Sequence, residues 1–450
     1  MHLPSRLLPR MIAAGALLGA GLARGADPDA APAVPDTLDL KTAVEFALQH
    51  NYAIRQAREQ IRQQEGVEIT VRARQIPTIG AGAGYQRNAK EISVFGPPDN
   101  DRAWSIDLQA RQVLYAGGGV TAAVRSSDLA RQAAVLQLEG VINAQLLAVR
   151  TQFDTVLLDR QQIQVQEENV GLLEQQLKDA QSRYTAGTTS NFEVLRAEVA
   201  LANGQPPLIQ ARNDYRVAIE QLRQLIGFTS SPGADVAKVP EFEGTLEAGA
   251  PVTLQLADAL AAARAHRPEL QQLAKLEQSA EQNVTANRAG YLPEVDLVGG
   301  YTWERGPALA DWGSRSEGWT AGLQASWNIF DGRATAGRIV QAKSQLAQSQ
   351  LTLANTTLAI EVQVRQAYSA LTEAWELVQA TGKSVEQAQE ALRLANVRYN
   401  AGTATQLDVL TSQVALTQSR VNQLQAFYNY SVARASLRQA MGEGDEFVAH

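Results

Sequence analysis

Apolar residues recur along much of the chain at the spacing of a coiled coil. Between residues 163 and 184 they are separated by steps of seven, three, four, three and four residues, and the same steps recur between residues 378 and 399. Such steps place side chains on one stripe of an α-helix. We therefore predict long helices at residues 120–182 and 335–398, each about 95 Å long at roughly 1.5 Å per residue.

The stripe is expected to continue in a return helix after each long helix. It would run through Phe192, Leu195 and Val199 in the first return helix. In the second it would run through Leu407, Leu410, Val414, Thr417, Val421 and Leu424. Two adjacent prolines, Pro206 and Pro207, interrupt the first pattern. A proline inside a helix removes a hydrogen bond and costs about 3 kcal/mol. We therefore expect a kink or break between residues 202 and 207, in the first return helix only.

Four shorter segments alternate between apolar and polar residues, as in a β-strand with two different faces; in one of them Trp104, Ile106 and Leu108 alternate with polar residues. We predict strands at residues 76–87, 104–114, 292–303 and 319–330. Each has about the length that a tilted strand needs to cross a hydrocarbon core. Five of the six tryptophans, at positions 104, 303, 312, 319 and 327, lie in or between these strands, as in an interfacial aromatic belt. The alternative is a soluble sheet of amphipathic strands.

The chain is one unit written twice. The stretch RYTAGTTSNFEVLRAEVAL at 183–201 reappears as RYNAGTATQLDVLTSQVAL at 398–416, with ten of nineteen residues identical. The units span residues 38–228 and 251–442, joined by a linker at 229–250 and followed by a tail at 443–450. Each unit is predicted to contain a helix, two strands, a long helix, a tip and a return helix, with the tips at 183–190 and 399–405.

The first 25 residues have the features of a secretory signal peptide. Arg6 and Arg10 precede a short apolar run at 11–23, and small residues flank the expected cleavage site at Gly25. The run is too short to span a bilayer, so residues 1–25 are expected to direct export and residues 26–37 to form a flexible lead-in. The chain contains no cysteine, which excludes disulfides, a cysteine nucleophile and a lipid-modified cysteine.

The remaining composition argues against two other classes of function. The formal net charge is -7 and there is no basic stripe, so nucleic acid is a poor candidate partner. No nucleophile has a plausible base, and no residue spacing suggests a metal site. We expect neither an enzyme nor a bound cofactor.

Four strands that lie in a membrane cannot close a barrel, because the smallest known barrels have about eight, so several chains must share one. The tandem units, the strand endings Tyr115-Ala-Gly-Gly and Phe330-Asp-Gly, and the Tyr-x-x-Gly turns before Glu193-Val-Leu and Asp408-Val-Leu together resemble the TolC family of outer-membrane channel proteins. The resemblance covers essentially the whole mature chain.

This resemblance implies a mixed α and β membrane protein that forms a homotrimer. Its twelve-stranded barrel in the outer membrane, in contact with lipid, would be continuous with a twelve-helix coiled-coil barrel in the periplasm. The tips would dock onto a periplasmic adaptor that belongs to an inner-membrane pump. The protein would then be the passive exit duct of a tripartite efflux or type I secretion system. An exported coiled-coil scaffold or adaptor without a pore is the alternative, but it would need no tryptophan-flanked strands.

The repeated stretch would form the periplasmic tips. Gly187 and Gly402 suit a tight reversal between helices, where a residue without a side chain takes positive φ. Ser190 with Glu193, and Thr405 with Asp408, have the spacing of a capping box that begins the return helix.

The resemblance also assigns roles at the tips. It places Asp408 at the periplasmic gate, together with Glu193, Thr411 and Tyr399. Thr411 stands where the family's best-known gate has a second aspartate, and Ala404 stands in place of an arginine. Whether Asp408 gates the tunnel or only caps a helix is left open. The residues expected to dock onto the adaptor are Arg183, Tyr184, Gly187, Thr188, Ser190, Val194, Leu195, Arg398, Gly402, Thr403, Val409 and Leu410.

Overall fold

The computed structural model describes residues 37–87, 102–228, 240–305, 316–445 and 447. The predicted signal peptide, nearly all of the lead-in, and Trp312 lie outside the described residues.

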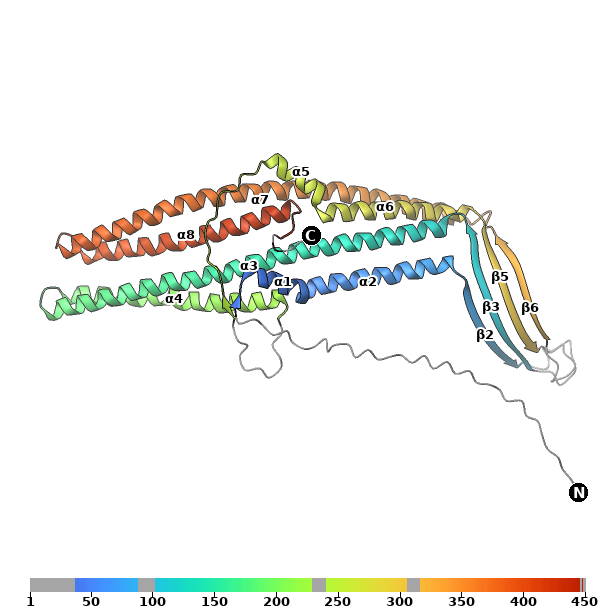
Figure 1. Ribbon diagram of the computed structural model, residues 1–450, viewed down its shortest axis with the longest axis horizontal. Coiled ribbons are helices and arrows are strands. Elements are labelled where there is room, and N and C mark those ends of the chain that lie inside the picture. Colours follow the sequence, from blue (N-terminus) through green and yellow to red (C-terminus); the bar gives the residue numbers. More distant parts are fainter. Residues whose placement is uncertain (1–36, 88–101, 229–239, 306–315, 446, 448–450) are drawn as a thin grey trace, which may run out of the picture.

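The molecule is elongated, with long helices over most of its length and four strands at one end (Figure 1). The elements of the first repeat are β1 (Thr37–Leu38), α1 (Leu40–His50), α2 (Tyr52–Arg72), β2 (Thr78–Arg87), β3 (Arg102–Ala116), α3 (Gly119–Thr185) and α4 (Asn191–Ile226). The linker contains β4 (Glu241–Phe242), and the second repeat contains α5 (Leu256–His266), α6 (Pro268–Arg288), β5 (Glu294–Arg305), β6 (Ser316–Ser326), α7 (Ala334–Asn400) and α8 (Gln406–Ala440).

The four long strands form one antiparallel sheet in the order β2-β3-β5-β6. Pairing partners share a face: Ile79 lies opposite Ala110, Ala83 opposite Ile106, and Tyr85 opposite Trp104. Most of the large apolar side chains therefore lie on one face of the sheet. Trp319 and Leu323 on that face are 76% and 69% exposed, so an apolar surface is left uncovered in the single chain.

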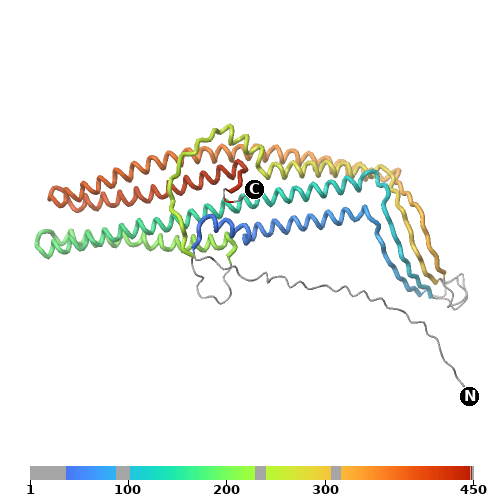
Figure 2. The backbone as a smooth tube through the Cα atoms, viewed as in Figure 1, coloured from blue at the N-terminus to red at the C-terminus, as the bar shows by residue number. Residues whose placement is uncertain are grey.

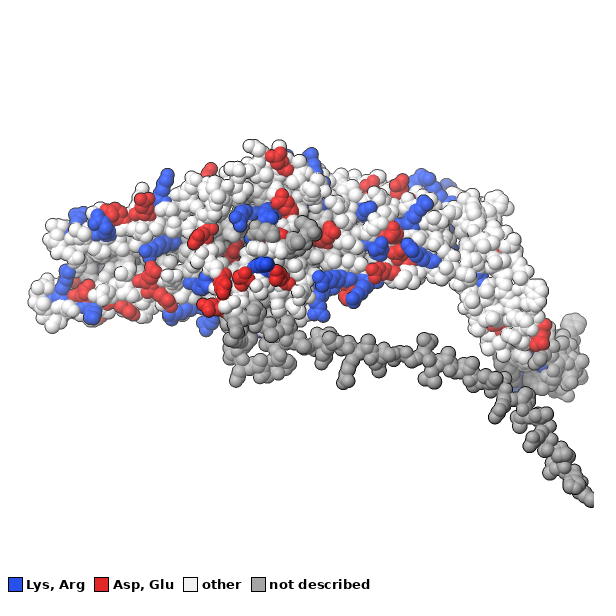
Figure 3. Space-filling model, in the orientation of Figure 1, with Lys and Arg blue, Asp and Glu red and all other residues white. Residues whose placement is uncertain are grey.

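The opposite face of the sheet carries small and polar residues. Gly82 lies opposite Asp107, and a Cβ on this glycine would come within 2.6 Å of the Asp107 carboxylate. Near the helical end, Arg111 of β3 donates a hydrogen bond of 2.6 Å to the buried Asp296 of β5. Figure 3 shows that charged side chains on the visible side gather over the helices and are sparse over the strands.

Two helical hairpins run away from the sheet, α3 with α4 and α7 with α8. Because α3 also contacts α8, the helices lie in the order α4, α3, α8, α7 (Figure 2). Each of α3 and α7 has 67 residues, so each reaches about 100 Å. By length and composition α3 has one window apolar enough for a membrane span; a single window of this kind is weak evidence, and α3 packs against α2, α4, α6 and α8.

The coiled-coil stripe behaves as predicted in the long helices and differently in the return helices. Val170, Leu173 and Ala180 of α3 are buried, as are Val378, Val385 and Ala395 of α7. In the return helices the predicted stripe is wrong near the tips, where Phe192, Leu195, Val199, Leu407 and Val414 are exposed and only Leu410 is buried. Further along α8, Thr417, Val421 and Leu424 are partly buried. Other positions of these helices, among them Val194, Ala197, Val409 and Leu416, pack inside the chain instead. Each return helix thus has two apolar faces, and only one is covered.

Of the kink or break predicted in the first return helix, the break is wrong and the kink stays a prediction. Helix α4 continues through Pro206 and Pro207 without interruption. The prolines have no N–H to donate to the carbonyls of Ala202 and Asn203, four residues earlier. All four residues are exposed, so water can donate to these carbonyls instead. On the inner side, a Cβ on Gly204 would lie 2.6 Å from Leu173 Cδ1, so α4 packs closely on α3 at this point. Packing against α3 outweighs the cost of the prolines.

The single helix predicted before each strand pair is two helices. Asn51 ends α1 and begins α2, where its Oδ1 accepts a hydrogen bond of 3.1 Å from the backbone N–H of Ile54. Its Nδ2 donates to the Leu225 carbonyl at 2.7 Å. In the second repeat Arg267 occupies the corresponding break, and Pro268 begins α6.

Each repeat builds its own apolar core halfway along the molecule. The first includes Val44, Phe153, Leu222 and Phe242, and the second includes Val364 and Tyr430. Parallel pairing of β1 with β4 ties the start of the first repeat to the linker.

The return helices end against the first short helix of their own repeat. Gly227 follows α4 with φ 77°, and a Cβ there would lie 2.2 Å from the His50 carbonyl oxygen. Gly442 follows α8 with φ 78°, and a Cβ there would lie 2.6 Å from the His266 carbonyl carbon. Only glycine fits this approach of one backbone to another.

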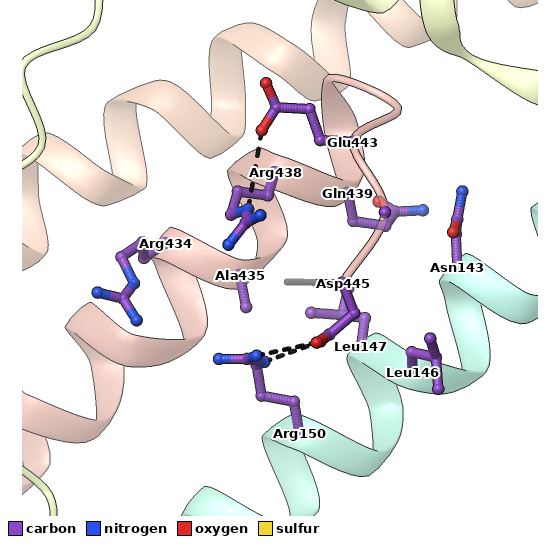
Figure 4. A pocket seen from close by; sticks show the side chains of 11 residues that line it. Asn143, Leu146, Leu147, Arg150, Arg434, Ala435, Arg438, Gln439, Glu443 and Asp445 are labelled. Carbon is purple, nitrogen blue, oxygen red and sulfur yellow. Dashed lines mark hydrogen bonds and ion pairs between the residues drawn. The ribbon is translucent and has the colours of Figure 1, made fainter. Parts of the chain in front are cut away.

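The C-terminal segment lines a small pocket together with α3 and α8 (Figure 4). The Asp445 carboxylate accepts hydrogen bonds of 3.1 and 3.2 Å from the Arg150 guanidinium, and both side chains are buried. One helical turn further along α3, Asp154 accepts a hydrogen bond of 2.6 Å from the Ser431 hydroxyl of α8, and burial raises the pKa of this carboxyl. These contacts fix the two hairpins to each other at mid-length.

Candidate functional site

The two tips reverse the chain by the same backbone geometry. Gly187 has φ 73° and Gly402 has φ 75°, which confirms the predicted positive φ. The Gly187 N–H donates to the Tyr184 carbonyl, and the Gly402 N–H donates to the Tyr399 carbonyl, at 2.9 and 3.0 Å. The next N–H in each tip donates to the carbonyl five residues earlier, at 2.9 Å. This pair of bonds satisfies carbonyls that a helix end leaves without partners.

The second tip carries a complete capping box. The Asp408 backbone N–H donates to Thr405 Oγ1 at 3.3 Å, and the Thr405 backbone N–H donates to Asp408 Oδ2 at 2.7 Å. The backbone bond from Thr405, and then the bond from its hydroxyl, hold the pKa of the Asp408 carboxyl below its usual range. Asp408 is therefore an exposed anion whose orientation is fixed by the start of α8.

The capping box predicted for the first tip is wrong. Ser190 precedes α4 without a side-chain cap hydrogen bond. The Glu193 carboxylate instead accepts hydrogen bonds of 3.3 and 3.2 Å from Arg196, one turn along the helix. The same guanidinium lies 4.6 Å from the centre of the Phe192 ring. Arg196 thus draws Glu193 along the helix and away from its N-terminus.

The two tips touch each other through Arg183. Its guanidinium carbon lies 4.5 Å from the centre of the Tyr399 ring, and its Nη2 lies 3.5 Å from Asn400 Oδ1. Cations over aromatic rings at this distance are attracted to the ring face. Tyr399, one of the predicted gate residues, therefore contacts the first tip, whereas Glu193 and Asp408 are each engaged within their own tip. Sequence reasoning placed Arg183 among the docking residues and missed Asn400.

The predicted docking residues fall into two groups. Val194, Val409 and Leu410 are buried in the hairpins, so in this conformation they are not available to a partner. Arg183 is half-buried, and the exposed members are Tyr184, Gly187, Thr188, Ser190, Leu195, Arg398, Gly402 and Thr403. The predicted gate residue Thr411 is also exposed.

Comparison with known proteins decides the family. The family model described as outer membrane efflux protein matches residues 43–228 and 259–443, which is most of the chain and falls into two parts, one per repeat. The chain belongs to the outer membrane efflux protein family. It is an outer-membrane exit duct for efflux or type I secretion, and its helical part lies in the periplasm.

Relatives of this efflux protein match it over most of their length. The chain is 24% identical over 378 residues to protein CyaE of Bordetella pertussis, covering 84% of this chain and 78% of the relative. It is 22% identical over 395 residues to the outer membrane protein TolC of Escherichia coli, covering 82% and 75%. A crystal structure of CusC superimposes with a TM-score of 0.76 at 18% identity, covering 91% of this chain and 94% of CusC, which shows the same fold.

The family is one of channels, and the described residues add no sign of a metal centre. Within the described ranges no group of three or more His, Cys, Asp or Glu side chains is arranged to hold a metal ion. At the tips Glu193 pairs with Arg196, Arg183 stacks on Tyr399, and Asp408 caps α8.

Proposed function

We propose that three copies of this chain assemble head to tail into a closed duct with twelve strands and twelve tunnel helices, and that its tips dock onto a periplasmic adaptor of an inner-membrane pump. The observation that carries this proposal is the pair of open edges. The outer strands of the sheet are β2 and β6, and each is paired on one side only within the described chain. An unpaired strand edge in a hydrocarbon core leaves backbone groups without partners, so β6 of one copy pairs with β2 of the next.

The helices support the same arrangement. The outer helices of the four-helix layer are α4 and α7. Exposed apolar residues lie on both, including Phe192, Leu195 and Val199 on α4, and Leu351 and Leu358 on α7. When α7 of one copy packs on α4 and, nearer the sheet, on α2 of the next, these side chains leave water. The uncovered face of α4 is then an interface between copies. Pairing an edge with a different edge makes a heterologous contact, which closes into a ring.

At the tips, we propose that Asp408 forms the periplasmic gate with Tyr399, Thr411 and Glu193. Three copies would bring three Asp408 carboxylates around one opening, where they attract cations. The exposed tip residues, among them Tyr184, Thr188 and Thr403, would be the docking surface for the adaptor. The capping role of Asp408 is compatible with this role, because its Oδ2 bonds to Thr405 while the carboxylate stays exposed.

Mass measurement of the intact protein in mild detergent tests the assembly. We expect a species of three chains, and a folded single chain would contradict the proposal. A matched pair of variants locates the interface: Leu351→Glu on the outer helix face should disrupt the trimer, whereas Glu174→Gln on the exposed surface of α3 should leave it intact.

Adaptor docking is tested by co-purification with the adaptor encoded beside the pump, where Thr403→Trp should reduce capture and leave the trimer mass unchanged.

A further inference from the structure

The apolar face of the sheet continues beyond its last strand. Trp327 follows β6 at the alternating spacing of the face that carries Leu323. It is 57% exposed, and its indole N–H donates to the Tyr291 carbonyl at 3.0 Å. Ile329 and Phe330 come next and are 82% and 84% exposed. The apolar surface therefore reaches the turn between β6 and α7, which we call the β6–α7 corner (residues 327–333).

The β6–α7 corner lies at the periplasmic surface of the outer membrane. The chain is an outer-membrane protein whose helical part lies in the periplasm, so the strands cross the membrane and end where the helices begin (Figure 1). Tryptophan with a satisfied N–H is typical of the headgroup level of a bilayer. Trp327, Ile329 and Phe330 are therefore placed to contact lipid of the periplasmic leaflet.

The corner ends at an arginine in an unusual backbone conformation. Arg333 has φ 71° and ψ 14°, and it is the one non-glycine residue with positive φ in the part of the chain that the structure describes. A residue with a side chain rarely adopts this conformation. Arg333 also directly precedes α7, where the positive end of the helix dipole disfavours a cation. Two local preferences thus oppose an arginine at this position.

The first repeat has a glycine at the same place. Gly118 corresponds to Arg333 at the offset of 215, and its φ is 78°. Like Arg333, it directly precedes a helix of 67 residues. The two corners therefore share their backbone geometry, and the turn itself needs no arginine.

The corner stays accessible when a neighbouring strand lies beside it. Leu114 and Tyr115 correspond to Ile329 and Phe330, and Tyr115 pairs with Val295 of β5 in the same chain. Leu114 and Tyr115 are nevertheless 56% and 47% exposed. In the proposed ring, β2 of the next copy would lie beside β6 in the same way. We therefore expect about half of this apolar surface to remain exposed after assembly.

The charge of Arg333 is available to a ligand. Its side chain is exposed, and within the described ranges it forms neither a hydrogen bond nor an ion pair. The neighbouring Asp331 is engaged elsewhere: its Oδ2 accepts from the Thr335 N–H at 2.7 Å and lies 3.9 Å from Arg338. A guanidinium binds phosphate oxygens in pairs. A phospholipid headgroup supplies a phosphate at this depth, next to acyl chains that exposed apolar side chains can contact.

We propose that the β6–α7 corner binds a phospholipid of the periplasmic leaflet, with the phosphate on Arg333 and the acyl chains along Ile329 and Phe330. The proposal goes beyond the duct function, because it concerns how the duct is held at the membrane surface, and it does not depend on the number of copies. Since the first repeat has Gly118 in place of the arginine, each chain carries one such site.

Native mass spectrometry of the detergent-solubilised full chain tests this, with phosphatidylglycerol as the added lipid. Arg333→Gly removes the cation and suits the positive φ, so the corner keeps its fold, which an unchanged melting temperature checks. We expect this variant to bind phosphatidylglycerol on the order of fivefold more weakly, and Arg333→Lys to keep most of the binding. Lys178→Gln is the control, because it removes an exposed cation near the far end of α3. Equal lipid binding by Arg333→Gly and the unmodified protein would overturn the proposal.

Two further probes identify the bound group. Diacylglycerol with the same acyl chains lacks the phosphate, so we expect it to bind weakly and to the same extent with or without Arg333. Inorganic phosphate should not displace phosphatidylglycerol, because Ile329 and Phe330 add contacts that only a lipid can make. Displacement would indicate a site for free anions and would overturn the lipid assignment. If the measured mass is that of one chain, the proposed trimer fails, while the lipid bound per chain still tests this inference.

Discussion

The two tips have the same backbone and different side-chain chemistry. Gly187 and Gly402 reverse the chain with φ values of 73° and 75°, and both are followed three residues later by a Ser or Thr that precedes the return helix. Only the second tip forms a capping box. The difference arises one turn further on, where the first repeat has Arg196 and the second has Thr411.

This difference shows how one residue outside a motif decides whether the motif forms. Arg196 offers Glu193 a charged partner, and charge-assisted hydrogen bonds are stronger than those from a neutral backbone N–H. Thr411 offers no such partner to Asp408, whose shorter side chain turns back to Thr405. One tip therefore presents an acid paired with arginine, and the other presents an exposed anion held by the helix cap.

The largest expected effect concerns cation block of the tunnel. Asp408→Asn should weaken block by multivalent cations on the order of tenfold in planar-bilayer recordings, because three carboxylates disappear from one opening. Glu193→Gln should change block little, since Arg196 already neutralises that acid. Unchanged block in the Asp408 variant would sink the gate assignment.

The shared backbone predicts equal costs at the two tip glycines. Gly187→Val and Gly402→Val should each destabilise the tip by about 1–3 kcal/mol, because a β-branched residue is strained at positive φ. Nothing lies within 4 Å of a Cβ at either position, so crowding adds nothing. Local hydrogen exchange of the tip amides measures the change. Gly171→Val, in the exposed helical part of α3, is the control and should be neutral or slightly stabilising.

A buried acid distinguishes the two long helices. Burial, with a smaller contribution from the Asp214 charge, raises the pKa of Asp159 to about 6, whereas the corresponding residue of α7 is the buried Ala374. Between about pH 4 and pH 6 the folded state binds the extra proton, so stability falls as pH rises through this window and stays lower above it. Asp159→Asn should therefore raise stability at pH 7 by on the order of 1–3 kcal/mol and have little effect at pH 4.

Urea unfolding in detergent at the two pH values measures this effect. Asp214→Asn is the control, because it removes only the smaller contribution and should give a smaller gain. Equal gains for Asp159→Asn at both pH values would contradict the titration as the cause.

The smallest expected effect is on stability and concerns the N-caps of the two return helices. Thr405→Ala should destabilise the start of α8 by about 0.5–2 kcal/mol, since it removes a side-chain acceptor from the helix N-terminus. Ser190→Ala should cost close to nothing, because the Ser190 side chain makes no cap hydrogen bond. Exchange rates of the Asp408 and Glu193 amides give the comparison. A large loss in the serine variant would show that the first tip is capped after all.

Sequence reasoning succeeded where a pattern is local and repeated. The period of two located the strands, the coiled-coil steps located α3 and α7, and glycine at the tips gave the positive φ. It failed where a tertiary partner decides. Arg196 overrode the capping spacing of Glu193, and packing of Gly204 on Leu173 kept α4 continuous through two prolines.

The return-helix stripe failed for a related reason. Phe192 and Leu195 do belong to an apolar face, yet the single chain buries Val194 and Ala197 instead. A period of three and four residues identifies apolar positions and cannot assign each face to a partner within or outside the chain. The contact of Arg183 with Tyr399 was equally beyond local pattern, because 216 residues separate them.

The glycines that end the return helices hold one end of each helix at the middle of the molecule, so a rotation about that end displaces the tip at the other end. Gly227 and Gly442 fix one end against the carbonyls of His50 and His266, where no side chain could be admitted. Helices α4 and α8 have 36 and 35 residues, so each is roughly 50 Å long. A rotation of about 10° about the fixed helix end then displaces the tip by about 9 Å, which is close to the width of a helix. A mutation that loosened either glycine contact would therefore change the position of the tip most, some ten helical turns away.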